Sequence, residues 1–175
     1  LSQEARDITI TAIGVGKTFN MAGFAMSSVV IPNKTLKEKF LKTYTRIHFA
    51  EGNILSHVAF EAAYTHGQVW LNELKIHLMK NYEMLKEVCD KYPALVKLTP
   101  IESTYLAWID CKCLGLNNKK LRDFFASEAK LGLNAGLSFG REGNGFMRLN
   151  FAVSSAKMFK IVEQLDDALK NKTKG

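Results

Sequence analysis

The segment ITITAIGVGKTFN at residues 8–20 decides which fold this chain adopts. Its first six residues, 8–13, are β-branched or apolar in near-alternation, a pattern that predicts a β-strand. Gly14 and Gly16 then end the strand, because glycine permits positive φ and close backbone approach. We therefore expect Lys17 in a loop at the carboxyl end of a strand, where open α/β sheets keep their ligand crevices. A single lysine is usually a solvated surface residue, so its neighbours must decide whether it is functional.

The composition excludes several broad classes of protein. Hydrophobic residues make up 47% of the 175 residues and charged residues 23%, as in an ordinary globular protein. The net charge is +7, but the lysines are scattered among acidic residues, which favours a solvated surface over a nucleic-acid partner. No apolar run approaches the ~18 residues of a transmembrane helix, so we expect no membrane association. The chain starts with leucine and not methionine, so we expect a fragment or a processed product.

The cysteines and histidines form no disulfide or metal pattern. Cys89, Cys111 and Cys113 are an odd set without a repeated CxxC pair, which is typical of reduced thiols in a cytoplasmic protein. The four histidines never stand four residues apart, so the sequence predicts no metal site.

Beyond Lys17 the pattern predicts a second strand at 26–31 and then two helices. Thr35 and Glu38 form a capping box at the start of the first helix. Asn53 is the expected cap of the second helix, and Gly67 ends it. The expected packing face of that second helix consists of Leu55, Val58, Ala59, Ala62 and Ala63.

The longest predicted element is a helix over 71–92. Apolar residues recur there at alternating spacings of three and four, and Pro93 stops the helix. Such a helix is long against the mean of ~11–12 residues and could bridge two lobes. Short elements follow: strands at 96–99, 105–110 and 146–153, a helix capped by Asn117 or Asn118, and a last helix capped by Ser154 or Ser155.

Two chemistries compete for Lys17. The first is phosphate binding by a P-loop, because TAIGVGKT at 11–18 matches GxxxxGK[ST] except at its first position. A P-loop must open directly into a helix, whereas residues 18–24 are glycine-broken and Pro32 follows closely, so a nucleotide binder is the remote alternative. The second is imine formation with an aldehyde, of which pyridoxal 5'-phosphate (PLP) is the best-known protein case.

The residues around Lys17 resemble a known family. GKTFNMAGF at 16–24, followed by VVIPN at 29–33, looks like the Schiff-base lysine region of PLP-dependent class I/II aminotransferase-type enzymes. It is closest to their C–S lyase branch, the cystathionine β-lyases. The resemblance runs through nearly the whole chain, and the order and spacing of its blocks are together more specific than any block alone. The further blocks are 53–56, 61–74, 104–110, 133–140 and 145–152.

The resemblance implies roles for two residues. Lys17 would hold the cofactor, be displaced by the substrate amine and then take the α-proton as the freed base. Arg148, in the block FMRLN at 146–150, would bind the substrate α-carboxylate. A guanidinium suits that role because it stays charged and bonds a carboxylate bidentately.

Other residues in these blocks receive no catalytic role. We expect Tyr105 and Trp108 to pack in the core or line a wall. Asn134 and Asn150 are expected to make loop and strand hydrogen bonds.

One departure concerns the cofactor phosphate. Family members usually have serines where this chain has Gly14 and Gly16. The serine three residues before the lysine helps to hold the phosphate, so Gly14 leaves that hydroxyl missing.

The resemblance covers only the C-terminal portion of such an enzyme. We expect an α/β fold of the PLP-dependent transferase type (fold type I). Residues 1–66 would be the end of the large PLP-binding domain, 67–92 an interdomain helix and 93–175 a small α+β domain. The N-terminal part that carries the glycine-rich phosphate loop, the ring-stacking aromatic and the aspartate for the pyridine nitrogen is absent from the 175 residues.

The implied activity is PLP-dependent cleavage of the C–S bond of L-cystathionine or related cysteine conjugates by β-elimination, with release of thiol, pyruvate and ammonia. A PLP-dependent aminotransferase is the alternative, because it would use the same lysine and arginine. A third possibility is that the isolated chain is catalytically inactive. The resemblance also implies a homodimer that acts on a small amino-acid substrate, and we expect it in the cytoplasm.

Overall fold

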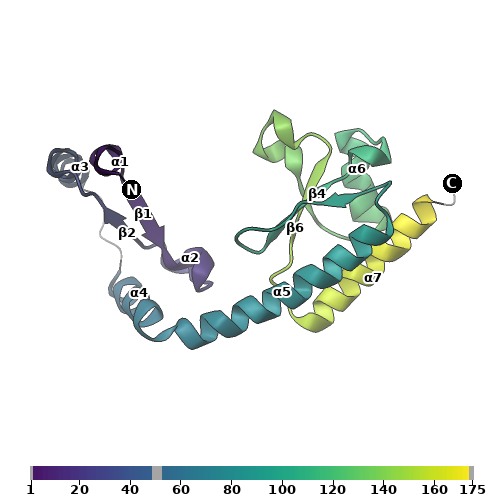
Figure 1. Cartoon of the computed structure of the whole chain (residues 1–175), viewed down its shortest axis with the longest axis horizontal. Coiled ribbons are helices and arrows are strands. Elements are labelled where there is room, and N and C mark those ends of the chain that lie inside the picture. The colour runs from purple at the N-terminus through teal and green to yellow at the C-terminus, as the bar shows by residue number, and fades with distance from the viewer. Residues whose placement is uncertain (1, 49–52, 174–175) are drawn as a thin grey trace. The chain divides into compact units, whose positions relative to one another are not determined.

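The computed structural model describes residues 2–48 and 53–173 of the chain, and Figure 1 labels most of its helices and strands. The chain divides into two compact units, Leu1–Asn72 and Glu73–Gly175. Each unit has its own sheet. Within the described residues, no helix is both long enough and apolar enough to cross a membrane.

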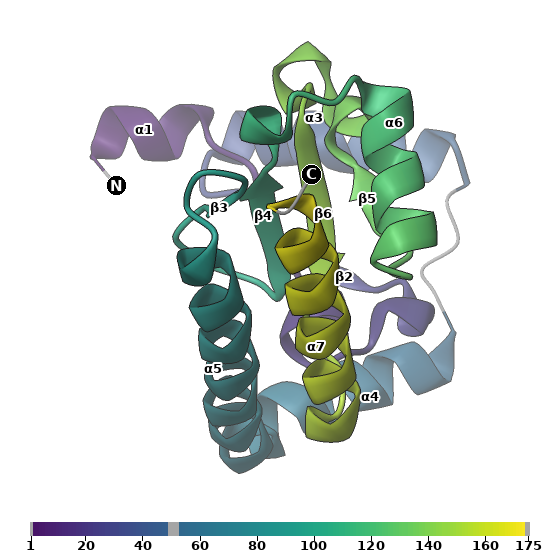
Figure 2. The same cartoon turned by 90° about the vertical axis from the view of Figure 1, so that its right-hand side faces the viewer.

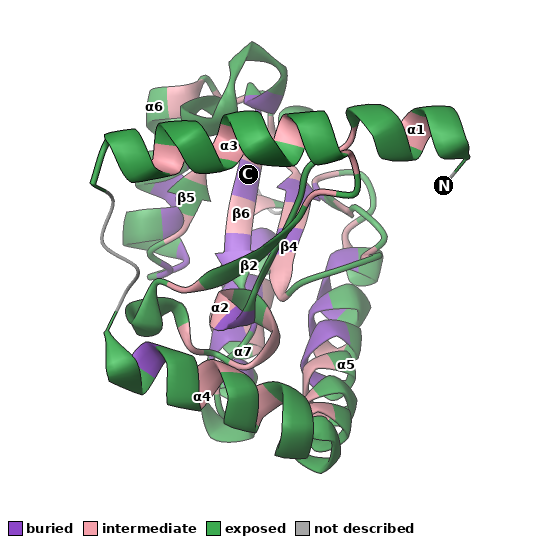
Figure 3. Cartoon of the chain, turned by 90° about the vertical axis from the view of Figure 1, so that its left-hand side faces the viewer, coloured by how far each residue is buried: buried purple, intermediate pink, exposed green. Residues whose placement is uncertain are grey.

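The first unit is built from short helices around a two-stranded antiparallel sheet. Its elements are α1 (Gln3–Ile8), β1 (Thr11–Gly14), α2 (Val15–Thr18), the 3-10 turn η1 (Ala22–Phe24), β2 (Ser27–Val30), α3 (Lys34–Arg46), α4 (Ile54–His66) and the start of α5 (Gln68–Lys91). In the sheet, Thr11 pairs with Val30 and Gly14 with Ser27. Every residue of β1 and β2 is exposed within this chain, and Figure 3 shows β2 largely in green.

The prediction that the first strand covers 8–13 is wrong at its start. Ile8 belongs to α1, and the strand begins only at Thr11. The helix is stabilised at its N-terminus, because the Ser2 hydroxyl accepts a hydrogen bond from the backbone N–H of Ala5 at 3.2 Å. This cap outweighs the β propensity of the isoleucine. The second predicted strand is confirmed at Ser27–Val30.

The capping box predicted at Thr35 and Glu38 is also wrong. Asn33 caps α3 instead, and its Oδ1 accepts from the backbone N–H of Leu36 at 2.9 Å. Asparagine caps helices at least as well as threonine, so the helix starts two residues earlier than a Thr35 cap would allow.

The second helix has the predicted ends but not the predicted packing face. Asn53 caps α4 by accepting from the backbone N–H of Ser56 at 2.9 Å, and Gly67 follows its last turn. Leu55 and Val58 are 66% and 61% exposed, and only Ala59 and Ala63 of the expected face are half-buried, so most of that face is uncovered in this chain. Figure 3 shows α4 mostly in green. The buried residue on this helix is Ser56, whose hydroxyl donates to the carbonyl of Phe24 at 2.8 Å.

The second unit packs two long helices on an antiparallel sheet. It holds the rest of α5, β3 (Lys97–Leu98), β4 (Leu106–Asp110), η2 (Lys112–Leu114), α6 (Asn118–Asp123), the π-helical turn η3 (Phe124–Glu128), β5 (Asn134–Ala135), η4 (Gly136–Phe139), η5 (Arg141–Gly143), β6 (Phe146–Asn150) and α7 (Ser155–Lys172). The strand order is β3-β4-β6-β5. In Figure 2, α5 and α7 lie side by side over one face of this sheet, and Lys91 pairs with Asp166 between them.

The core of the second unit is formed by alternate residues of its strands and by one face of each of its long helices. In β4 and β6 alternate residues are buried, as expected for strands with one covered face. The predicted long helix is confirmed. Its buried residues share one face, since Leu85 stands three or four positions from each of the others, which are Asn81, Tyr82, Val88 and Cys89. The core includes Leu85, Cys89, Ala107, Ile109, Met147, Leu149, Leu165 and Leu169. Burial raises the pKa of the Cys89 thiol to about 12 and also raises the pKa of Cys111.

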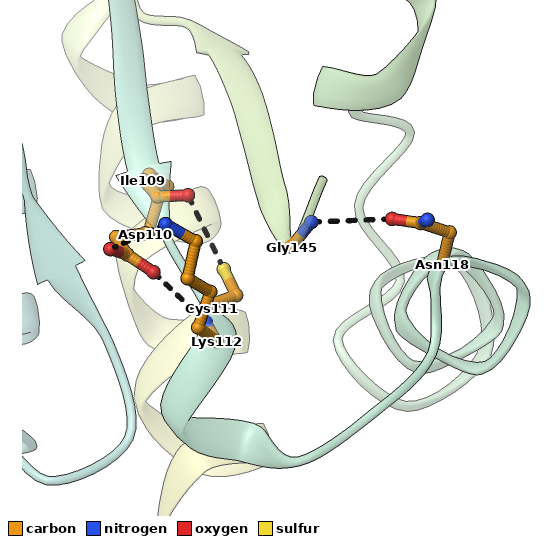
Figure 4. Close-up of polar contacts among 6 residues, drawn as sticks. All are labelled: Ile109, Asp110, Cys111, Lys112, Asn118 and Gly145. Atoms are coloured by element: carbon orange, nitrogen blue, oxygen red, sulfur yellow. Dashed lines mark hydrogen bonds and ion pairs between the residues drawn. The ribbon is translucent and has the colours of Figure 1, made fainter. Parts of the chain in front are cut away.

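Two hydrogen bonds stabilise the edge of the sheet where β4 ends and β6 begins. Figure 4 shows the Asp110 carboxylate accepting from the backbone N–H of Lys112 at 3.0 Å, and Gly145 donating its N–H to the Asn118 side chain at 3.3 Å. Gly145 has φ +79°, and a Cβ there would lie 2.7 Å from Lys112 Cγ. Only glycine fits this position without strain, because L side chains rarely adopt such backbone angles.

Candidate active site

The candidate cofactor lysine lies on a single helical turn and not in a loop. Gly14 ends β1, and Lys17 is the third residue of α2, whose Val15 is fully buried. The helix stops at Thr18 and is followed by η1 and then by β2. One turn does not supply the helix N-terminus on which a P-loop relies, so the structure does not match the nucleotide hypothesis.

Lys17 lines a shallow depression of about 390 Å³ in the first unit. The walls are mostly small or apolar, because Gly14, Gly16, Ala22 and Ala25 bring backbone close to the space. A Cβ on Gly16 would come within 3.3 Å of Ala22 Cα, so glycine there permits close approach of the two segments. The remaining lining residues are Met21, Met26 and Ser27.

The donors around this depression fit PLP. The lining residues include an amine, which can bond covalently to an aldehyde, and a hydroxyl, which can donate to a phosphate oxygen. None of the described lining residues is acidic, so no carboxylate there would repel the phosphate dianion. A cofactor that carries both an aldehyde and a phosphate therefore suits this set of groups.

Arg148 lies in the second unit, in the middle of β6, between two neighbouring strands. It pairs with Trp108 of β4 on one side and with Asn134 of β5 on the other. Its Nη2 donates to Asn134 Oδ1 at 3.0 Å. Its guanidinium carbon lies 4.3 Å from the centroid of the Phe139 ring, a cation–π distance. The arginine is therefore held in place by an amide and an aromatic ring.

The guanidinium keeps an unused donor. Arg148 Nε is buried and has no hydrogen-bond partner among the described residues, and none of the ion pairs found in that part of the chain involves Arg148. A buried N–H without a partner is costly. A bound carboxylate would supply the missing acceptor and the missing negative charge together.

Two of the groups that hold Arg148 were not anticipated. Asn134 was expected to make only a loop hydrogen bond, and no role was predicted for Phe139. The contact with Asn134 depends on β5, a two-residue strand too short to show a pattern. Phe139 also packs edge-on against Trp108, with ring centroids 5.8 Å apart, which agrees with the packing expected of that tryptophan. Asn150 behaves as expected, since its side chain accepts from the backbone N–H of Ala152 at 2.9 Å.

The two predicted site residues belong to different units of the structure. Lys17 lies in Leu1–Asn72 and Arg148 in Glu73–Gly175. Each has its own local environment: a small-walled depression for the lysine, and an amide with an aromatic ring for the arginine.

Comparison with known proteins places the chain in a family. No protein-family model matches the chain. The cystathionine beta-lyase PatB of Bacillus subtilis strain 168 is 32% identical over 169 residues, which cover 97% of this chain and 44% of PatB. The crystal structure of cystalysin from Treponema denticola, which contains a pyridoxal 5'-phosphate cofactor, matches with a TM-score of 0.89 and 32% identity. That match covers 97% of this chain and 43% of cystalysin.

Among the curated relatives, aminotransferases match at lower identity, whereas the crystal structure of a PLP-bound putative aminotransferase from Clostridium difficile 630 matches at 32% identity with a TM-score of 0.89. The aspartate aminotransferase of Pyrococcus horikoshii is 24% identical over 170 residues, which cover 94% of this chain and 42% of that enzyme. The chain spans less than half the length of the curated relatives it matches. The prediction from the residues around Lys17 is thus confirmed at the level of family and fold: the chain belongs to the PLP-dependent, fold type I aminotransferase-like family, in its C–S lyase branch, and corresponds to the C-terminal part of that fold.

Proposed function

We propose that this chain provides the cofactor lysine and the substrate-binding arginine of a PLP-dependent C–S β-lyase. The observation that carries the proposal is the buried Nε of Arg148, which lacks an acceptor while Asn134 and Phe139 hold the guanidinium. A carboxylate is the acceptor that a guanidinium fork bonds best. The choice of a lyase is supported by the curated relatives, since PatB is 32% identical to this chain and the aspartate aminotransferase of Pyrococcus horikoshii is 24% identical.

Each residue has a defined task in this proposal. PLP, when bound, supplies an electron sink for the negative charge that develops at the substrate α-carbon. The Lys17 amine holds the cofactor and, once the substrate amine has displaced it, removes the proton from the substrate α-carbon. Arg148 orients the substrate by binding its α-carboxylate. With L-cystathionine the balance is one water consumed, and one homocysteine, one pyruvate and one ammonia released.

The proposal extends to the organisation of the full-length protein. We assign residues 1–66 to the large PLP-binding domain, 67–92 to an interdomain helix and 93–175 to the small domain. The boundary between the compact units, at Asn72 and Glu73, supports this division because it falls inside the helix. We further propose a homodimer in the cytoplasm, where thiols such as the free Cys89, Cys111 and Cys113 stay reduced. Light scattering after size-exclusion chromatography tests the dimer.

The test of function uses the full-length protein with PLP and L-cystathionine. Pyruvate is followed by coupling to lactate dehydrogenase, and the released thiol by a chromogenic disulfide. We expect pyruvate and thiol in equal amounts without any added keto acid. Amino transfer that requires a keto acid and releases no pyruvate would favour the aminotransferase.

Two variants separate the proposed role of Lys17 from a general effect of removing a lysine. Lys17→Ala should abolish pyruvate release and the visible absorbance of the bound cofactor. Lys34→Ala removes an exposed lysine at the first position of α3 and should retain both. Equal behaviour of the two variants would contradict the assignment of Lys17.

A further inference from the structure

Position 14 has no side chain, and the hydroxyl of a neighbouring strand reaches the space it leaves. Gly14 and Ser27 are direct partners in the pairing of β1 with β2, so their side-chain directions share one face of the sheet. A Cβ built on Gly14 would lie 3.2 Å from Ser27 Oγ, closer than ordinary van der Waals contact. The Ser27 hydroxyl therefore lies where a side chain at position 14 would point.

Ser27 belongs to the same depression as Lys17. Both residues line it, together with Gly14, Gly16, Met21, Ala22, Ala25 and Met26. Among these described lining residues, Lys17 and Ser27 alone have side chains that donate hydrogen bonds. No side-chain hydrogen bond joins Ser27 to any other residue in the described part of the chain. The hydroxyl is thus available to a bound group.

The chemistry of the cofactor indicates which group that is. In PLP the phosphate ester is attached, through a methylene group, to the ring carbon next to the one that carries the aldehyde. When the aldehyde carbon is bonded to Lys17, the phosphate must therefore lie near the same lysine. A phosphate dianion needs several charge-assisted hydrogen bonds to compensate its lost hydration.

We propose that Ser27 donates a hydrogen bond from its Oγ to the cofactor phosphate, in place of a side chain at position 14. This inference rests on the proposed function, since it takes Lys17 as the residue bonded to PLP. It also explains how a glycine at position 14 is compatible with cofactor binding: the donor comes from the paired strand. The cost of Gly14 to cofactor affinity is correspondingly smaller than the sequence alone suggests.

The neighbouring serine provides a matched control. Ser28 follows Ser27 in β2 and pairs with Ile13. Successive residues of a strand point to opposite faces, so the Ser28 side chain points away from the face that Gly14 and Ser27 share. Ser28→Ala removes the same hydroxyl from the same strand without touching the depression, and Ser28 is not among the residues that line it.

The experiment compares the affinities of the full-length apoprotein for PLP and for pyridoxal, which has the aldehyde but no phosphate. Both are titrated by visible absorbance. We expect Ser27→Ala to weaken PLP binding by about tenfold or more, the loss of one charge-assisted hydrogen bond, and to leave pyridoxal binding unchanged. Ser28→Ala should change neither. The double variant Gly14→Ser, Ser27→Ala should recover PLP affinity, because removal of Ser27 Oγ makes room for the new side chain at 14.

The outcomes separate this inference from the function on which it rests. If the wild-type protein does not bind PLP at Lys17, the proposed function fails. If the wild-type protein binds PLP but Ser27→Ala leaves its affinity intact, or weakens PLP and pyridoxal equally, only the role of Ser27 fails. Should Ser27→Ala unfold, Ser27→Cys preserves the size of the side chain with a weak donor and should show the same selective loss for PLP.

Discussion

Replacing Arg148 by lysine tests the carboxylate site while keeping its charge. In the structure Arg148 gives one donor, Nη2, to Asn134 and keeps a buried Nε without a partner. A carboxylate on the guanidinium would accept two charge-assisted hydrogen bonds, whereas an ammonium would supply one. Loss of one such bond costs roughly 1.5–3 kcal/mol. At 1.4 kcal/mol per tenfold, that predicts roughly a 10- to 150-fold loss in kcat/KM.

The assay is pyruvate release from L-cystathionine by the full-length protein, with kcat and KM determined separately. The dissociation constant of an unreactive amino acid, read from the absorbance of the bound cofactor, should rise by a similar factor. Arg141→Lys is the matched control, because Arg141 is exposed on the neighbouring turn η5 and should leave all three constants unchanged. A loss below about threefold in Arg148→Lys, with PLP still bound, would refute the assignment of Arg148.

Three further predictions follow from the same structure. Gly145→Ala should lower the free energy of unfolding by about 1–2 kcal/mol or more in denaturant titrations, because φ is +79° and the new Cβ would meet Lys112; an unchanged midpoint would contradict this. Burial raises the pKa of Cys89 from 9.0 to about 12. The contribution of the neutral buried thiol to the free energy of unfolding is therefore complete below pH 9, and it falls by about 1.4 kcal/mol per pH unit as the pH rises towards 12. Cys89→Ala should flatten that alkaline slope, and equal slopes would count against the buried thiol. The isolated 175-residue chain should bind PLP weakly or not at all, because β1 and β2 are exposed throughout and a two-stranded sheet is marginally stable by itself; a tight, stoichiometric absorbance titration would show the reverse.

Sequence reasoning succeeded where a signal repeats along the chain. The apolar pattern predicts helix α5 to within three residues at its start and one at its end, because the apolar positions recur over several turns and Pro93 stops the helix. Asn53 is the predicted cap of α4, and Ser154 is one of the two caps predicted for α7, because in each case a side-chain acceptor stands directly before an apolar pattern. The family could be predicted from several blocks whose order carries more information than any one of them, and the comparisons confirm it.

It failed where neighbouring signals compete or where contacts come from distant residues. Asn33 and Thr35 are both good caps two positions apart, and the choice between them depends on a small free-energy difference. The hydrogen bond from Arg148 to Asn134 joins residues 14 apart across a two-residue strand. The closeness of Gly14 and Ser27 is set by strand register, which local pattern does not fix. Sequence motifs were therefore enough to predict Lys17 and Arg148 as site residues, whereas their neighbours could be identified only from the structure.

The most direct test of the account is to find which lysine carries the cofactor. The full-length protein is loaded with PLP, reduced with borohydride to fix any lysine-bound cofactor, digested and analysed by mass spectrometry. We expect a phosphopyridoxyl group on the peptide that contains Lys17, and no such group on the corresponding peptide of Lys17→Ala. A modified peptide that excludes Lys17, with the Lys17 peptide unmodified, would contradict it.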